Sequence, residues 1–143
     1  MLKRLCLAAL VSTVTAIAVE SKPVVSLPKG WRLLVVKRAH CRHCVQWVKQ
    51  VYIPWNKLGM NKLIQHDAIE ILDAEVDAEV EKLVSYLNTR KIREDVASVP
   101  AFIILDPSGQ EKRQCRFDGY SSYRSFRDQL SQVIASCTKE NKA

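Results

Sequence analysis

The sequence predicts an α/β domain in which a mixed sheet of about four strands carries helices on both faces. Short apolar runs typical of buried strands alternate along the chain with amphipathic segments at helical spacing. Such alternation indicates parallel strands joined by helices. The turn sequence Asp-Pro-Ser-Gly at residues 106–109 indicates that the last strand returns antiparallel beside its neighbour.

The first half of the domain is expected to be a strand followed by a long helix. Residues 33–36 form a continuous apolar run bounded by charges, which is typical of a buried strand. After the segment 40–44, apolar residues recur at helical spacing: Val45, Val48 and Tyr52, with Trp47 and Val51 alongside. Pro54 should end or kink this helix because proline lacks an N–H group. Residues 56–65 are a candidate continuation.

The second half should contain the remaining strands and two more helices. Strands are expected at residues 68–73, at 101–105 and through about 114–117, where Asp118 and Gly119 end the last one. The intervening helix carries an apolar stripe made of Val80, Leu83, Val84 and Leu87. The inner stripe of the final helix consists of Tyr123, Phe126, Leu130, Val133, Ile134 and Cys137.

The N-terminus has the pattern of a secretory signal. Lys3 and Arg4 precede an uncharged stretch of apolar and small residues at 5–19, and Ala-Ile-Ala at 16–18 suits a signal peptidase. The stretch is shorter than the ~20 apolar residues that span a bilayer. We therefore expect a signal peptide at 1–18 and a periplasmic or secreted protein. The alternative is a protein anchored in the membrane by an uncleaved N-terminal segment.

The rest of the chain is expected to be an approach segment at 19–30 and one folded domain at 31–143. A chain of this length buries an adequate core without covalent staples. Export places its cysteines in an oxidising compartment. The pair Cys41 and Cys44 is therefore better explained by chemistry than by scaffolding.

Cys41 and Cys44 are predicted to form a redox pair at the start of the first helix. There the Cys41 sulfur faces unpaired N–H groups and the positive end of the helix dipole, which favour the thiolate. Cys44, one turn further on, should be shielded and should resolve mixed disulfides. Arg42 and His43 lie between the cysteines, and residues 21–66 contain nine Lys and Arg but no Asp or Glu. We expect these cations to lower the pKa of Cys41 below about 8.5.

Two other site chemistries fit the same residues less well. A structural zinc site usually needs two cysteine pairs, whereas Cys115 and Cys137 lie 22 positions apart. His40 or His43 could complete a copper or zinc site with the Cys41 pair, which is the metal-handling alternative. The cations lack the interleaved aromatic residues of a nucleic-acid site. We therefore expect no nucleic-acid partner, and the favoured function needs no cofactor or metal.

These features resemble the thioredoxin superfamily over about residues 31–137. The resemblance rests on the 33–36 strand leading into Cys41-Arg42-His43-Cys44, Val99-Pro100 before the 101–105 strand, the turn at 107–109 and Asp118-Gly119-Tyr120. The local pattern is most similar to exported bacterial thioredoxin-like proteins of the SoxW type. This resemblance implies a thioredoxin-like three-layer sandwich and a protein thiol–disulfide oxidoreductase.

The resemblance also implies roles for single residues. Cys41 would be the attacking cysteine and Cys44 the resolving one. Pro100 would be a cis-proline facing the disulfide, and the backbone of Val99 would pair with an extended substrate segment. The implied partners are protein thiols or disulfides and a membrane-bound or soluble redox partner, and the protein is expected to be a monomer.

Several positions depart from the thioredoxin pattern. His40 stands where thioredoxins have Trp, and Arg42-His43 replaces Gly-Pro. A histidine before the second cysteine is shared with oxidising relatives such as DsbA and protein disulfide isomerase. Val35 stands where thioredoxins bury an acid. These departures favour an oxidant or isomerase over the alternative, a periplasmic thioredoxin-like reductant, with Arg42 and His43 stabilising the thiolate.

Cys115 and Cys137 allow two interpretations. Both could be small core residues, or they could form a structural disulfide with each other. A third function hypothesis stands beside the oxidoreductase and the metal-handling module, namely a thioredoxin-fold binding protein with vestigial chemistry.

Overall fold

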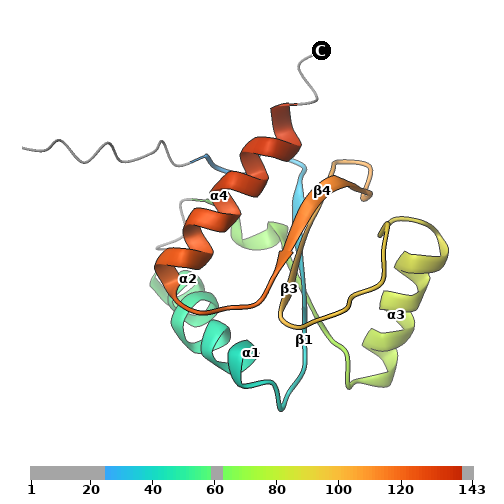
Figure 1. The fold of residues 1–143 in the computed structure, drawn as a ribbon, viewed down its shortest axis with the longest axis horizontal. Coiled ribbons are helices and arrows are strands. Elements are labelled where there is room, and N and C mark those ends of the chain that lie inside the picture. Colours follow the sequence, from blue (N-terminus) through green and yellow to red (C-terminus); the bar gives the residue numbers. More distant parts are fainter. Residues whose placement is uncertain (1–24, 59–62, 140–143) are drawn as a thin grey trace, which may run out of the picture.

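The computed structural model describes residues 25–58 and 63–139 (Figure 1). Strands and helices follow one another in the chain order that the sequence predicts. The elements are β1 (Arg32–Lys37), α1 (Arg42–Trp47), the π-helical stretch η1 (Val48–Tyr52), α2 (Ile53–Leu58), the short 3₁₀ helix η2 (His66–Ala68), β2 (Ile69–Asp73), α3 (Asp77–Asn88), β3 (Ala101–Leu105), β4 (Glu111–Asp118) and α4 (Tyr123–Lys139).

The strands form one mixed sheet in the order β2-β1-β3-β4. β1 runs parallel to β2 and antiparallel to β3, and β4 runs antiparallel to β3. The helices α1, α2 and α4 cover one face of the sheet, and α3 covers the other (Figure 1). The predicted α/β sandwich, with a four-stranded mixed sheet between two helical layers, is therefore confirmed.

Burial on both faces explains why β1 and β3 are unbroken apolar runs. Successive side chains of a strand point to opposite faces. Leu33 and Val35 accordingly enter one core, and Leu34 and Val36 enter the other. β3 is buried along its whole length. A strand covered by helices on both sides needs apolar residues at every position, so β1 and β3 are shared by the two cores.

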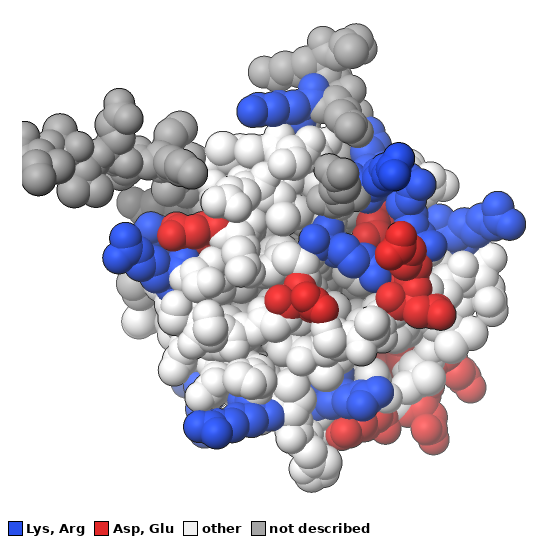
Figure 2. Space-filling model, in the orientation of Figure 1, with Lys and Arg blue, Asp and Glu red and all other residues white. Residues whose placement is uncertain are grey.

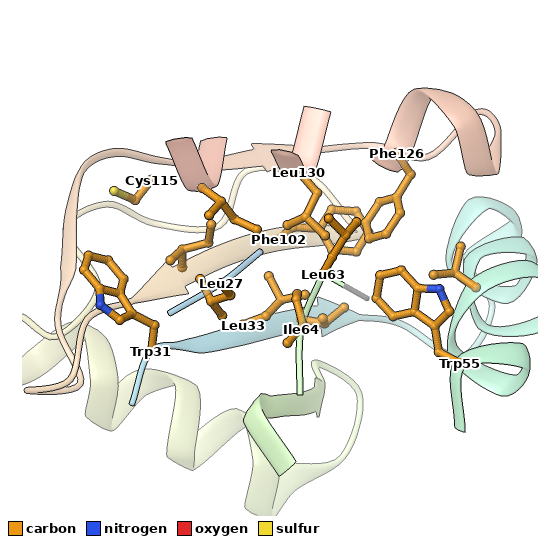
Figure 3. Close-up of a cluster of buried hydrophobic side chains, with 14 of the residues drawn as sticks. Leu27, Trp31, Leu33, Trp55, Leu63, Ile64, Phe102, Cys115, Phe126 and Leu130 are labelled. Atoms are coloured by element: carbon orange, nitrogen blue, oxygen red, sulfur yellow. The ribbon is translucent and has the colours of Figure 1, made fainter. Parts of the chain in front are cut away.

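The larger core, beneath α1, α2 and α4, is built around aromatic rings (Figure 3). The ring centre of Phe102 on β3 lies 5.4 Å from that of Trp47 and 4.8 Å from that of Phe126. Aromatic pairs of this kind contribute about 0.5–1.5 kcal/mol beyond the burial of their area. Through the central strand, these contacts connect α1 to α4.

Residues 25–30, expected to belong to an approach segment, also contribute to this core. Leu27 is buried there, and its N–H donates a hydrogen bond of 2.6 Å to Leu63 O. The N–H of Val25 donates to the hydroxyl of Ser131 on α4 at 3.2 Å. The predicted signal peptide at residues 1–18 lies outside the described residues. Among the helices of the described ranges, none has the length and apolarity that crossing a bilayer requires.

Pro54 does not end the first helix, which continues to Leu58. The turn before it widens into the π-helical stretch η1, where the N–H of Ile53 donates to Val48 O, five residues back. Proline cannot donate to the preceding turn, and a π-helical turn is a known way to change the hydrogen-bond pattern inside a helix. Of the continuation expected over residues 56–65, the described helix includes only the part up to Leu58.

In two helices, one valine of the expected stripe lies outward, while Val48, Tyr52, Leu83 and Leu87 pack against the cores as expected. The buried residues of the first helix are Cys44, Trp47, Val51 and Trp55. Val45 is instead 39% exposed, whereas the two tryptophan side chains are buried. In α3, Val84 is 45% exposed and Tyr86 is buried, with its hydroxyl donating to Glu70 at 3.0 Å. The expected stripes are therefore confirmed except at Val45 and Val84.

The last helix is tied to the sheet by a disulfide. α4 buries Phe126, Leu130 and Ile134 as its stripe predicts. Its Cys137 forms a disulfide with Cys115 on β4, and both cysteines are buried. Of the two interpretations that the sequence leaves open for this pair, the structure has the disulfide.

We predict that replacing both Cys115 and Cys137 by alanine lowers the free energy of unfolding by about 2–4 kcal/mol, because the cross-link restricts the unfolded chain. Urea unfolding followed by circular dichroism measures this loss. The matched control, Cys41→Ala with Cys44→Ala, removes a disulfide that closes a much shorter loop and should lose less. Equal stability of the Cys115/Cys137 variant and the unmodified protein would contradict a structural role.

Candidate functional site

Cys41 and Cys44 form a disulfide at the start of the first helix, just after the turn that follows β1. After β1 the chain turns sharply, and Cys41 takes the N-cap position of α1 with an extended backbone (φ −78°, ψ 112°). Cys44 lies one turn into the helix and is only 1% exposed, whereas Cys41 is half-buried. An incoming sulfur can therefore reach Cys41 more readily than Cys44.

The helix start supplies the electrostatic environment of Cys41. The backbone N–H of Cys44 donates a hydrogen bond of 3.1 Å to the Cys41 sulfur. N–H groups in the first turn of a helix have no partner within the helix, and a negative side-chain atom at the N-cap satisfies them. When the disulfide is reduced, the same N–H and the helix dipole favour the Cys41 thiolate, which is the reactive form of cysteine.

The segment before β3 lies against this cysteine pair, although the two are far apart in the sequence. The Cys41 sulfur is 3.6 Å from Val99 O. The Val99–Pro100 peptide bond is cis, and Pro100 is buried while Val99 is partly exposed. Pro100 O accepts a hydrogen bond of 2.9 Å from the N–H of Gly119 at the end of β4. Two residues singled out in the sequence, Val99 and Pro100, thus lie directly beside the disulfide.

A buried carboxylate, Glu111, anchors the loop that leads to this segment. The Arg116 guanidinium donates to both Glu111 oxygens at 2.6 Å. The same guanidinium donates to the carbonyls of Glu94 and Asp95, and the N–H of Arg93 donates to Glu111 at 3.0 Å. The hydrogen bond to Glu111 raises the pKa of Arg116. This clamp is missed by sequence reasoning because an acid at the start of an edge strand has the pattern of a surface residue.

Arg42 and His43, predicted to stabilise the thiolate, are both exposed. Neither side chain hydrogen-bonds to a sulfur in the described part of the chain. The predicted stabilisation of the thiolate by these two residues would therefore act without direct contact. His43 also lines a hollow of about 290 Å³ together with Asp118, Tyr120 and Ser121, so the site has a polar flank.

An ion pair at the ends of the two parallel strands supports the turn that carries Cys41. Lys37 Nζ, on the last residue of β1, lies 2.6 Å from Asp73 Oδ2, on the last residue of β2. The N–H of Ala39 donates to Glu75 at 3.2 Å. The hydrogen bond from Lys37 lowers the pKa of Asp73, and the N–H of Glu75 acts in the same direction against the cost of burial. The sequence did contain a signal for this pair, because a charged residue follows the apolar run of each of the two parallel strands.

His40, which could have completed a metal site, is exposed. Among the described residues there is no group of three or more His, Cys, Asp and Glu side chains arranged to hold a metal ion.

We predict that Asp73→Asn lowers the free energy of unfolding at pH 7 by up to about 1 kcal/mol. Because the folded pKa of Asp73 lies below its ordinary value of 3.8, its contribution is present above that pH and is lost as the pH falls through the lowered value. The difference between variant and unmodified protein should therefore shrink below about pH 4. Urea unfolding at several pH values measures this, and the exposed Asp67→Asn is the control. A difference that grows on acidification would contradict the assignment.

Comparisons with known proteins give only distant likenesses. No protein-family model and no curated protein matches the chain. Among solved structures, the periplasmic thioredoxin SoxS from Paracoccus pantotrophus is 17% identical, with a TM-score of 0.48 over 75% of this chain and 98% of that one. Thioredoxin from Malassezia sympodialis is 12% identical (TM-score 0.44, 78% and 80% covered), and StoA from Bacillus subtilis is 8% identical (TM-score 0.43, 69% and 81% covered).

The chain's own architecture is more informative than these distant likenesses. A mixed sheet in the order β2-β1-β3-β4 lies between two helical layers, a Cys-x-x-Cys disulfide begins the first helix, and a cis-proline segment lies against it. This is a thioredoxin-like fold.

Proposed function

We propose that this protein is a thiol–disulfide oxidoreductase that acts on protein thiols through Cys41 and Cys44. The observation that carries the proposal is the unequal exposure of the two sulfurs at a helix start. Cys41 is accessible and receives an N–H hydrogen bond, while Cys44 is 1% exposed and lies within disulfide distance of it. One sulfur is thus suited to intermolecular attack and the other to the intramolecular step.

In the oxidising direction, a substrate thiolate attacks the Cys41 sulfur and breaks the Cys41–Cys44 bond. Cys44 leaves as a thiolate and takes up a proton, and a mixed disulfide joins substrate to Cys41. A second substrate thiolate then attacks the substrate sulfur, and Cys41 leaves as a thiolate that the N–H of Cys44 stabilises. Two electrons pass from substrate to enzyme, and a redox partner of the cell envelope reoxidises the pair.

Substrate binding is assigned to the backbone of Val99. Val99 is partly exposed, and its carbonyl lies 3.6 Å from the sulfur that forms the mixed disulfide. An extended substrate segment that pairs with this backbone would carry its cysteine next to Cys41. Backbone pairing does not depend on substrate sequence, so it suits an enzyme that acts on several proteins. Pro100, which is buried beside Val99, has no N–H and leaves this edge open for the substrate.

We further propose an oxidising or isomerising role outside the cytoplasm. Stabilisation of the reduced thiolate makes the corresponding disulfide a stronger oxidant. The helix start, Arg42 and His43 favour the Cys41 thiolate, and Val35, beneath the site, is apolar and fully buried. The signal-like N-terminus agrees with an exported protein, since an oxidising compartment maintains such disulfides.

We predict that Cys44→Ser accumulates mixed disulfides with substrate proteins, because nothing resolves them once Cys41 has reacted. Cys41→Ser should accumulate far fewer, since its remaining thiol is buried. Non-reducing gels of alkylated samples, followed by mass spectrometry of the adducts, measure both. Equal trapping by the two variants would contradict the assigned roles of the cysteines.

We predict a reduction potential for the Cys41–Cys44 couple of about −120 to −180 mV, the range of oxidants and isomerases. Equilibration with glutathione buffers measures it. The double variant Arg42→Gly, His43→Pro should be more reducing, because it removes the cations near the thiolate. A potential of about −270 mV or lower in the unmodified protein would place it among the reductants and refute the oxidising role.

A further inference from the structure

A groove borders the Cys44 side of the disulfide. It has a volume of about 250 Å³ and is mostly apolar. Its apolar lining comes from Ala39, Val45, Val48 and Ile53, and its charged rim from Arg38 and Lys49. We call these six residues the Cys44 groove. Cys44 itself also lines the groove, whereas Val99, which contacts Cys41, does not.

Three of the apolar lining residues, Val45, Val48 and Ile53, come from the first helix, and Ala39 comes from the turn before it. Trp47 and Val51 take the inner face, so Val45 and Ile53 remain 39% and 38% exposed. Large apolar side chains that stay exposed in a contiguous patch mark surfaces for association. The stripe formed by the three helix residues begins at Val45, directly after Cys44, so a protein bound to Cys41 is positioned to cover it.

The charge at the rim is positive and largely uncompensated. Lys37 also lines the groove, but it is paired with Asp73. Arg38 and Lys49 form no ion pair with any residue of the described ranges. The Glu75 carboxylate accepts a hydrogen bond from the N–H of Ala39. Figure 2 shows Lys and Arg side chains on both sides of an uncharged surface at the end where α1 begins, with the acids of that end gathered towards α3.

We propose that the Cys44 groove binds a segment of the client protein in which an apolar side chain is flanked by Asp or Glu. The apolar side chain covers Val45, Val48 and Ile53, and the client carboxylates meet Arg38 and Lys49. This inference rests on the proposed oxidoreductase function and names its preferred substrate class. Backbone pairing at Val99 tolerates many sequences, so the groove is what gives preference to clients with acidic, apolar flanks.

The test uses the oxidised full domain and two synthetic peptides, each with one cysteine and one leucine at the same positions. One peptide carries glutamate beside the leucine and the other carries lysine. The second-order rate of thiol–disulfide exchange is measured for each by stopped flow at low and high salt. We expect the acidic peptide to react about five-fold faster at low salt, since exposed charge pairs contribute up to ~1 kcal/mol each. High salt should reduce this ratio.

Two variants that change the net charge equally show whether the preference for the acidic peptide comes from the groove. Lys49→Glu should abolish or invert the ratio between the peptides. Arg113→Glu should keep it, because Arg113 is an exposed residue of β4 near the end of the sheet remote from the cysteines. Ile53→Ser should slow the leucine-containing acidic peptide more than a variant peptide with serine in place of leucine.

The outcomes separate this inference from the function on which it rests. No exchange with either peptide or with dithiothreitol would refute the oxidoreductase function itself. Exchange with both peptides at equal rates would leave that function intact and refute the acidic preference. A concentration-dependent dimer in sedimentation, disrupted by Ile53→Ser and accompanied by equal peptide rates, would assign the groove to a second copy of this chain and also refute the proposal.

Discussion

The antiparallel pairing of β1 with β3 is the constraint on which the site depends. Val36, at the end of β1, lies opposite Ala101, at the start of β3. The residues that follow β1 and those that precede β3 therefore emerge at the same edge of the sheet. This register brings Cys41 to within 3.6 Å of Val99 O across a separation of 58 residues. A slip of one residue would turn each buried side chain of β1 to the wrong face, so the two cores hold the register in place.

The remaining structure keeps this edge rigid from several directions. The Phe102 ring joins α1 to α4, and a buried disulfide holds α4 on β4. Glu111 and Arg116 anchor the loop before Val99, while Lys37 and Asp73 brace the turn before Cys41. None of these supports includes Cys41 or Cys44. Each nevertheless limits how far the turn that carries Cys41 and the segment that carries Val99 can move apart. In the proposed function the Cys41–Cys44 disulfide opens and closes, and a scaffold that does not depend on this bond suits that role.

One face of the first helix is buried in the core, and the opposite face lies at the surface. Its tryptophans fill the larger core, and this leaves Val45 and Ile53 outside, next to the cysteines. The π-helical stretch between α1 and α2 keeps the helix continuous in front of Pro54, so the outer stripe reaches Ile53. The cations of the acid-free segment 21–66 then have two consequences at this end of the molecule. Through Arg38 and Lys49 they give the groove a positive rim, and in the proposed function they stabilise the thiolate of Cys41.

Much of the fold and the position of the redox pair follow from local pattern. Unbroken apolar runs predict β1 and β3 because both faces of these strands are buried, and Cys41 is placed at a helix start by the apolar spacing that follows it. The disulfide of Cys115, the Glu111 clamp and the outward face of Val45 were decided only by tertiary structure. Local periodicity gives the spacing of apolar residues along a helix, but which face is buried depends on the volume that the opposing sheet must fill. Pairing between distant residues depends on strand register, which no single segment of the sequence contains.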